Sequence, residues 1–138
     1  MAQITDGIRA ILSHPIIYSS FYSFMGAHRS RKNFVANYVK PFSGMKILDV
    51  GCGPADILGY LPDVDYRGFD ISEAYIAQAK TRFGQCGRFN CKQLQFEDLA
   101  VLPKFDVVLA LGLLHHLDDS VAMGVLQLAY ETLKQGGR

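Results

Sequence analysis

The stretch KILDVGCGPAD, residues 46–56, constrains the fold more than any other part of the chain. It places the aliphatic residues of a buried strand directly before Gly51 and Gly53, and Pro54 then suits the first turn of a helix. Glycine lets the backbone turn sharply and lets a ligand come close to main-chain N–H groups. A strand that passes through such a turn into a helix is typical of nucleotide-binding proteins. We therefore expect a ligand site at the C-terminal end of this strand.

Strand and helix patterns alternate after this turn. The expected strands span 46–50, 66–70, 89–96 and 105–111. The expected helices span 4–12, 28–40, 54–61, 72–83 and 121–133, and Ser72 is the expected N-cap of the fourth. Tyr75, Ile76 and Ala79 would form the buried face of that helix. Alternation of this kind predicts an α/β fold in which helices cover a mainly parallel sheet.

Composition narrows the class of protein. The 138 residues are 49% hydrophobic and 20% charged, which fits one globular domain. The net charge of +1 gives no general attraction to nucleic acid or to a membrane surface, and no apolar segment approaches the ~20 residues of a membrane span. The three cysteines lack paired spacing, so we expect neither a disulfide framework nor a metal site, and a reducing, cytoplasmic location.

Acidic residues around the glycine turn indicate which ligand binds there. Asp70 ends the next strand nineteen positions after Gly51 (70 − 51), where a carboxylate can accept hydrogen bonds from a ribose diol. The alternative is that Asp70 only caps the following helix. Asp56 stands where the dinucleotide fingerprint has its third glycine, and an anion at that helix start would repel a pyrophosphate. Asp49 also suits a cationic group, so NAD fits this lining poorly.

Four segments together resemble one enzyme family. ILDVGCGPAD and YRGFDIS are similar to the first two motifs of class I S-adenosylmethionine-dependent methyltransferases. FDVVLALGLLHHLDD resembles their fourth strand, and LKQGG the turn after the next helix. The resemblance covers roughly residues 30–138 in the same order and spacing. It implies a Rossmann-like three-layer sandwich with strand order 3-2-1-4 and S-adenosylmethionine as cofactor.

The resemblance also implies a set of cofactor-binding residues. These are Asp49, Gly51, Cys52, Gly53, Asp70, Ile71, Gln95, Phe96 and Ala110. Asp49 would reach the methionine ammonium, Asp70 the ribose hydroxyls and Ile71 the adenine face. The Ala110 carbonyl would accept a hydrogen bond from the ammonium. Where the family commonly has an acid for the adenine amino group, this sequence has Gln95, which leaves that contact open between Gln95 and the acids that follow it.

No residue is assigned a catalytic role. A sulfonium methyl is already activated, so a general base is needed only if the acceptor must lose a proton. His115 and His116, after the fourth strand, are candidates for that base, and a structural role for both is the alternative. Adjacent side chains diverge, so this pair does not predict a metal site.

The N-terminal part, residues 1–40, is expected to be a helical extension or lid, and residues 41–138 the cofactor-binding domain. In HRSRK, Arg29 or Arg31 could pair with the methionine carboxylate, although such a segment is more often a solvated face. Tyr18, Tyr22 and Phe24 could line the acceptor pocket, although they could equally belong to a core.

Proteins of this class carry three further strands after LKQGG, so the chain is expected to be a piece of a longer methyltransferase. The strand at 105–111 would then have one edge without partners, and self-association through that edge is expected. The predicted function is methyl transfer from S-adenosylmethionine to a small molecule. A non-catalytic cofactor-binding or scaffold subunit and an NAD-dependent oxidoreductase are the alternatives.

Overall fold

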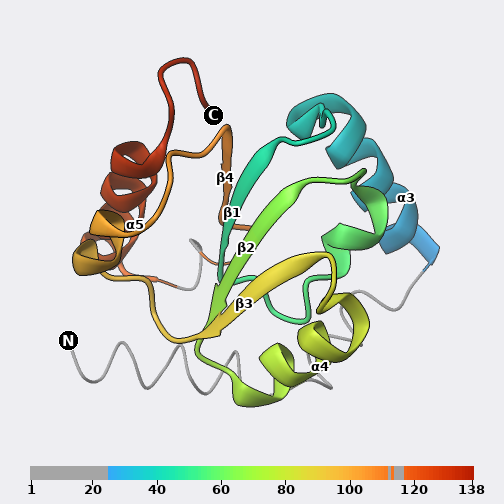
Figure 1. Cartoon of the computed structure of the whole chain (residues 1–138), viewed down its shortest axis with the longest axis horizontal. Helices are drawn as coiled ribbons and strands as arrows, with labels where there is room; N and C mark the ends of the chain where they lie inside the picture. The colour runs from blue at the N-terminus through green and yellow to red at the C-terminus, as the bar shows by residue number, and fades with distance from the viewer. Residues whose placement is uncertain (1–24, 112, 114–116) are drawn as a thin grey trace.

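A computed structural model of the chain describes residues 25–111, 113 and 117–138. Its centre is a sheet of four parallel strands in the order β3-β2-β1-β4 (Figure 1). The strands are β1 (Lys46–Val50), β2 (Asp65–Asp70), β3 (Gly87–Cys91) and β4 (Val107–Leu109). In register, Leu48 of β1 lies opposite Arg67 of β2 on one side and Val108 of β4 on the other. The strand order predicted from the sequence is confirmed.

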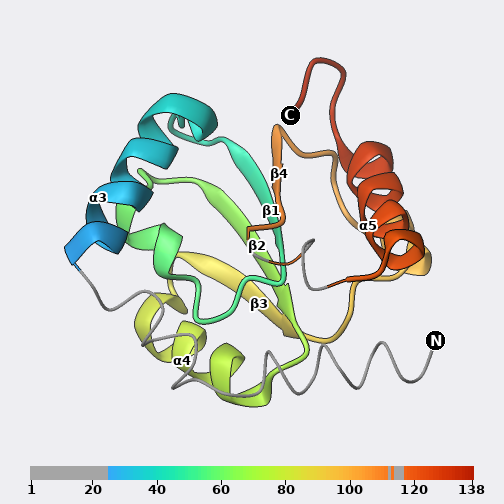
Figure 2. The ribbon, with the colours of Figure 1, turned by 180° about the vertical axis from the view of Figure 1, so that it is seen from behind.

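Helices cover both faces of this sheet, which makes the fold a three-layer α/β sandwich. The helices are α3 (Met25–Phe34), the π-helical η1 (Val35–Val39), the short 3-10 helices η2 (Asp56–Tyr60) and η3 (Phe96–Ala100), α4 (Glu73–Phe83) and α5 (Asp119–Thr132). α3, η2 and α4 lie on one side of the sheet, and α5 lies on the other (Figures 1 and 2). Among the described residues, no helix is both long enough and apolar enough to cross a bilayer.

Two separate apolar clusters fill the interior. The larger lies on the face of the sheet under α3, η2 and α4, and includes Ile47, Tyr66 and Ile76. The smaller lies on the α5 face and includes Leu48, Phe69 and Phe105. Ile47 and Leu48 are neighbours on β1 and are both fully buried, because successive strand residues point to opposite faces of a sheet. The near-continuous apolar sequence of β1 therefore reflects burial on both sides.

The helix α4 forms as its sequence predicts. The Ser72 hydroxyl accepts a hydrogen bond from the Tyr75 amide at 3.2 Å, which satisfies one of the amides that a helix start leaves unpaired. Tyr75, Ile76 and Ala79 are its buried residues. The expected helix at 28–40 is also present, as α3 continued by η1, with Val35 and Val39 buried in the larger cluster. The helix expected at 4–12 lies outside the described residues.

Three sequence-based boundaries are wrong. The strand expected at 89–96 ends at Cys91, because Gln95 and Asp98 form a capping box that starts η3. The strand expected at 105–111 is reduced to three residues, and the helix expected at 54–61 is the 3-10 helix η2. Apolar composition alone did not reveal where these backbone segments change conformation.

The expectation that one edge of the fourth strand lacks partners is also wrong for residues 105–108. Phe105 exchanges backbone hydrogen bonds with Thr132 and Lys134 at 2.8 Å, and Val108 N–H donates to the Arg138 carbonyl at 2.9 Å. The Arg138 side chain then donates to the Tyr38 and Val39 carbonyls at 3.1 and 2.6 Å, at the end of η1. The C-terminal residues thus cover much of this edge. Self-association of the chain stays a prediction, but an unpaired edge of the fourth strand no longer supports it. The division of the chain at residue 40 stays a prediction too.

Candidate cofactor site

A cavity of about 310 Å³ opens beside the C-terminal ends of β1 and β2, on the α5 face of the sheet. The sheet and the segments that follow β2 and β3 contribute Val50, Gly51, Phe69, Asp70, Ile71, Lys92, Gln93, Leu94, Gln95 and Phe96 to its wall. The other side of the wall is formed by Leu113, Leu117, Ser120, Val121, Gly124, Val125 and Leu128. Most of these side chains are apolar, and ligand pockets in parallel sheets lie at this position.

The cavity brings together five of the nine residues predicted for the cofactor site. Gly51, Asp70, Ile71, Gln95 and Phe96 line it. The other four, Asp49, Cys52, Gly53 and Ala110, are not among its lining residues. These five residues lie at the glycine turn and after β2 and β3, and their role in cofactor binding stays a prediction.

Asp70 joins the end of β2 to the glycine turn. Its two carboxylate oxygens accept hydrogen bonds from the Ser72 amide at 2.8 Å and from the Gly53 amide at 2.9 Å. Burial raises the pKa of this carboxyl group, and the backbone donors oppose that rise. Each carboxylate oxygen has a second lone pair, so the pair can still accept hydrogen bonds from a ligand hydroxyl. Asp70 thus holds the amide of Ser72, the residue that caps α4, and it also lines the cavity; its contact with a ribose stays a prediction.

Gly51 provides a close approach to the backbone. Its φ of +73° lies in the left-handed region, and its amide donates to the Phe69 carbonyl at 2.8 Å. A Cβ atom at this position would lie 3.1 Å from a methyl carbon of Leu113. Both the conformation and the lack of space therefore favour glycine. Gly53 and Ala55 also have positive φ angles, and Ala55 holds this conformation at a cost that glycine would not incur.

Asp49 and Cys52 lie beneath the turn, on the opposite face of the sheet from the cavity. The Asp49 carboxylate accepts a hydrogen bond from the Tyr66 hydroxyl at 2.6 Å. Burial, with a smaller contribution from the nearby Asp70, raises the pKa of Asp49 to about 7, although the Tyr66 hydrogen bond lowers it. Burial also raises the pKa of the Cys52 thiol, whose Sγ donates to the Gly53 carbonyl. The Cys52 side chain is thus a core residue and not an activated nucleophile.

The segment after β3 contributes polar side chains to the rim of the cavity. Gln95 caps η3, and Phe96 is 54% exposed at the cavity edge. Lys92, which sequence reasoning missed, lines the cavity and pairs with Asp98 at 2.6 Å. The hydrogen bond from Lys92 is the largest of the effects that hold the pKa of Asp98 below its usual value. Asp98 is therefore engaged with Lys92 and the Gln95 amide.

The sequence predicted the helix at 121–133, but it did not predict that residues of this helix, α5, line the cavity. Helical periodicity shows that one face of 121–133 turns inward, but not whether side chains fill the space it faces. Ala110, predicted to accept a hydrogen bond through its carbonyl, accepts one from the Leu113 amide at 3.5 Å. His115 and His116, the candidate bases, lie outside the described residues, as do Tyr18, Tyr22 and Phe24. Within the described ranges, no three His, Cys, Asp or Glu side chains gather as metal ligands would.

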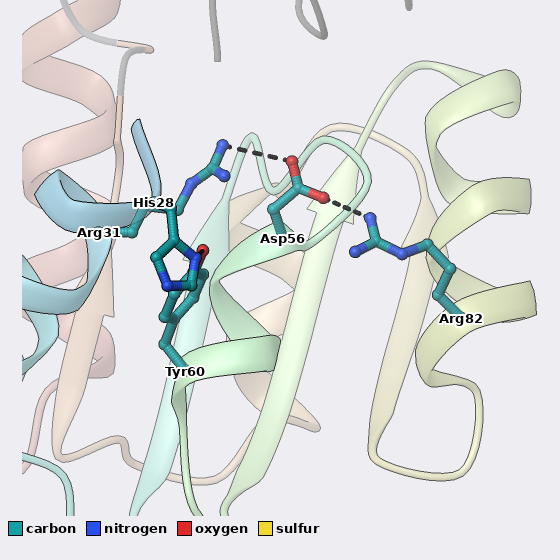
Figure 3. A network of polar contacts seen from close by, with 5 residues as sticks. All are labelled: His28, Arg31, Asp56, Tyr60 and Arg82. Carbon is teal, nitrogen blue, oxygen red and sulfur yellow. Dashed lines mark hydrogen bonds and ion pairs between the residues drawn. The ribbon is translucent and has the colours of Figure 1, made fainter. Parts of the chain in front are cut away.

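Asp56 does not present an unpaired negative charge, in contrast to the argument made from the sequence. Its carboxylate pairs with Arg31 of α3 at 3.3 Å and with Arg82 of α4 from the opposite side (Figure 3). Asp56 is paired from two sides, so repulsion of a phosphate by an unpaired anion no longer argues against NAD. Arg31, proposed for the methionine carboxylate, is engaged with Asp56, whereas Arg29 is exposed.

Comparison with known proteins decides between the cofactors. The family described as "Methyltransferase domain" matches residues 48–138, which include the glycine turn, Asp70 and α5. The chain belongs to the S-adenosylmethionine-dependent methyltransferases.

Two curated relatives of this methyltransferase chain are named as a methyltransferase of 27-O-demethylrifamycin SV and an O-methyltransferase of ubiquinone biosynthesis. The 27-O-demethylrifamycin SV methyltransferase of Amycolatopsis mediterranei is 34% identical over 103 residues, which are 70% of this chain and 37% of that protein. A ubiquinone biosynthesis O-methyltransferase of Pseudomonas putida is 33% identical over 114 residues, 78% of this chain and 47% of that protein. The chain thus spans less than half the length of these relatives.

Solved structures share the fold of this methyltransferase chain. Magnesium protoporphyrin IX methyltransferase of Synechocystis, solved with bound S-adenosylmethionine, has a TM-score of 0.62 at 21% identity and covers 94% of this chain and 66% of that one. A precorrin 8W decarboxylase of Methanobacterium thermoautotrophicum reaches 0.64 at 19% identity, with 80% and 60% covered. A decarboxylase among the similar folds shows that the architecture alone does not fix the reaction.

Proposed function

We propose that the described cavity binds S-adenosylmethionine, and that the chain supplies the cofactor-binding part of an enzyme that methylates a small molecule. The observation that carries the proposal is the cavity at the ends of β1 and β2, with the Asp70 carboxylate in its wall. Asp70 is tied to the glycine turn, so one carboxylate fixes the turn and offers acceptors to a ribose.

The residues of the cavity suit the parts of this cofactor. Asp70 would accept hydrogen bonds from the ribose hydroxyls, and the backbone at Gly51 would lie against the ligand because no Cβ intervenes. Ile71 and Phe96 would pack against the adenine ring, and Gln95 offers an amide at the same rim. When bound, the cofactor supplies an activated methyl group on sulfur. The apolar wall contributed by α5 would exclude water from that site.

The acceptor is proposed to be a small molecule with a hydroxyl group. This rests on the names of the relatives, which are an O-methyltransferase of ubiquinone biosynthesis and a methyltransferase of a 27-O-demethylated rifamycin. An enzyme that uses such an acceptor must hold its oxygen in line with the S–CH₃ bond. His115 and His116 stay the candidates for a base that removes the hydroxyl proton.

Calorimetry with S-adenosylmethionine, S-adenosylhomocysteine and NAD tests the cofactor assignment. We expect the first two to bind and NAD not to compete. Asp70→Ala should weaken S-adenosylmethionine binding by about 1.5–3 kcal/mol, the usual value of hydrogen bonds to a charged group. Unchanged affinity in a folded Asp70→Ala variant would contradict the ribose contact, and tight binding of NAD would contradict the cofactor.

A methyl-transfer assay separates an enzyme from a non-catalytic subunit. The intact protein should transfer radiolabelled methyl groups to phenolic or other hydroxylated compounds offered as a panel. Cofactor binding without transfer to any such compound would favour a binding or scaffold role instead. The Asp70→Ala variant should lose transfer together with affinity, which ties any activity to this site.

A further inference from the structure

Five side chains from three helices lie close together around the start and the end of η2 (Figure 3). We call this group the η2 clamp: His28 and Arg31 of α3, Asp56 and Tyr60 of η2, and Arg82 of α4. Asp56 is the first residue of η2 and Tyr60 the last, so α3 holds both ends of this short helix. His28 and Arg31 are three positions apart, which places them on the same face of α3.

The contacts within the clamp are close. The Arg31 guanidinium lies 3.3 Å from one Asp56 oxygen, and the Arg82 guanidinium pairs with the other. The Tyr60 hydroxyl and His28 Nδ1 are 2.6 Å apart, and their rings are tilted with centroids at 5.1 Å. Arg31 and Asp56 are only 17% and 20% exposed, so water screens their ion pair less than it would a surface pair.

The segment that the clamp holds is weak by itself. A 3-10 helix of five residues has strained hydrogen bonds, and its position depends on what packs against it. The turn before it contains Gly51, Gly53 and Ala55 in the left-handed region, including one residue with a side chain. Tertiary contacts must therefore hold the turn in this form, and Asp56 is the residue that directly follows it.

The charges of the clamp make Asp56 its central member. One carboxylate separates two guanidinium groups that come from opposite sides (Figure 3). Removal of that carboxylate would leave Arg31 and Arg82 facing each other as like charges, one of them largely buried. α3 and α4 would then lose their common attachment to the start of η2.

We propose that Asp56 is a positioning residue: by pairing with Arg31 and Arg82 it holds the glycine turn in the conformation that binds the cofactor. This inference rests on the proposed function of the cavity. Asp56 is not among the cavity-lining residues, so it acts through the turn and not by contact with the ligand. Loss of this pairing should therefore weaken the binding of the adenosine part of the cofactor as much as the binding of the whole cofactor.

Calorimetry with two ligands tests the proposal. S-adenosylmethionine carries the amino acid tail, whereas 5′-methylthioadenosine has the adenosine and thioether without it. Asp56→Asn should weaken both ligands by the same factor of about ten, within the range of coupling between contacting residues. Asp56→Glu, which keeps the charge, should restore part of the affinity, and Arg82→Met should weaken both ligands by a smaller equal factor.

Asp63→Asn is the matched control, because it removes one carboxylate from an exposed position before β2, at the opposite end of the strands. Its affinities should equal those of the wild type. If Asp56→Asn does not fold, Arg82→Met decides the question, since Arg82 is half exposed and only one of the two ion pairs is lost.

Each outcome bears on one claim. Affinities that change by less than about twofold in folded Asp56→Asn or Arg82→Met would overturn the positioning role. Weaker binding of S-adenosylmethionine alone would overturn it too, because the clamp would then act on the amino acid tail. A wild-type protein that binds neither ligand would instead contradict the proposed function of the cavity.

Discussion

The two faces of the sheet are built from the same strands but have different interiors. Under α3, η2 and α4 lies a continuous apolar cluster in which Ile47 and Ala79 are fully buried. Under α5, apolar side chains such as Leu94 and Leu128 instead line a cavity of about 310 Å³. Both faces thus carry a buried apolar cluster, but on the α5 face part of that apolar surface borders a cavity.

The two faces should therefore contribute differently to the stability of the fold and to the affinity for a ligand. A filled interior gains dispersion contacts on all sides, whereas side chains at a cavity wall lack partners on one side. The packed face also carries the buried Asp49, whose pKa is raised mainly by burial and further by the nearby Asp70. We therefore expect the packed face to dominate stability and the α5 face to dominate ligand affinity.

The largest expected effect is a pH dependence that arises on the packed face. Asp49 has a pKa of about 7 in the folded protein, against an ordinary value of 3.8. Between these values the folded state binds more protons than the unfolded state, so the free energy of unfolding should fall as pH rises from about 4 to 7. The loss is roughly 4 kcal/mol at most, since each pKa unit is worth about 1.4 kcal/mol.

Urea denaturation from pH 4 to 8 measures this dependence, and Asp49→Asn should remove most of it. Tyr66→Phe provides a second check, because loss of the hydrogen bond to the carboxylate should move the transition to higher pH. Stability that rises with pH in the wild type, with no difference in Asp49→Asn, would show that Asp49 is ionised throughout.

The next effect compares truncations on the two faces. Ile47→Ala removes a fully buried side chain from the packed cluster and should lower the free energy of unfolding by about 3 kcal/mol. Val121→Ala trims the cavity wall and should cost less than about 1 kcal/mol, because that side chain already borders a hollow. Denaturant midpoints measure both, and equal losses would mean that the cavity face is as well packed as the other.

The smallest effect is a contrast between two glycines. Gly124 of α5 lines the cavity with nothing within 4 Å of an added Cβ, so Gly124→Ala should stabilise the protein by about 1 kcal/mol through helix propensity. At Gly68, an added Cβ would lie 2.7 Å from Cys52 Sγ, so Gly68→Ala should destabilise by about 1 kcal/mol or more. Thermal melts should therefore shift in opposite directions, and a shift of the same sign would remove the contrast between the faces.

The sequence predicted those parts of the fold that local patterns determine. The strand at 46–50, the helix with Ser72 as its N-cap and the strand order all match the structure. The first two rest on a glycine turn, a cap or an apolar period that acts within a few residues, whereas the strand order follows from the resemblance to the methyltransferase family. The predicted Asp70 and Gly51 line the cavity because strand ends of a parallel sheet meet at one edge.

The rest depends on contacts between distant segments. Asp56 looked like an unpaired anion because Arg31 and Arg82 are 25 and 26 positions away in sequence. The edge of β4 looked unpaired because the residues that cover it, Lys134 and Arg138, follow a whole helix later. No local pattern reports such pairings, and none distinguishes a filled helix face from one that borders a cavity.

The contacts of Arg138 have a consequence for the order in which the protein can mature on the ribosome. The carbonyls of Tyr38 and Val39 at the end of η1 accept hydrogen bonds from a side chain 100 and 99 residues later in the chain. At the usual 5–20 residues per second, roughly 5–20 s pass between synthesis of these two partners. During that time the end of η1 must rely on water for these bonds. The helix η1, which is made early in the described chain, therefore gains these two hydrogen bonds only when the last described residue has been added.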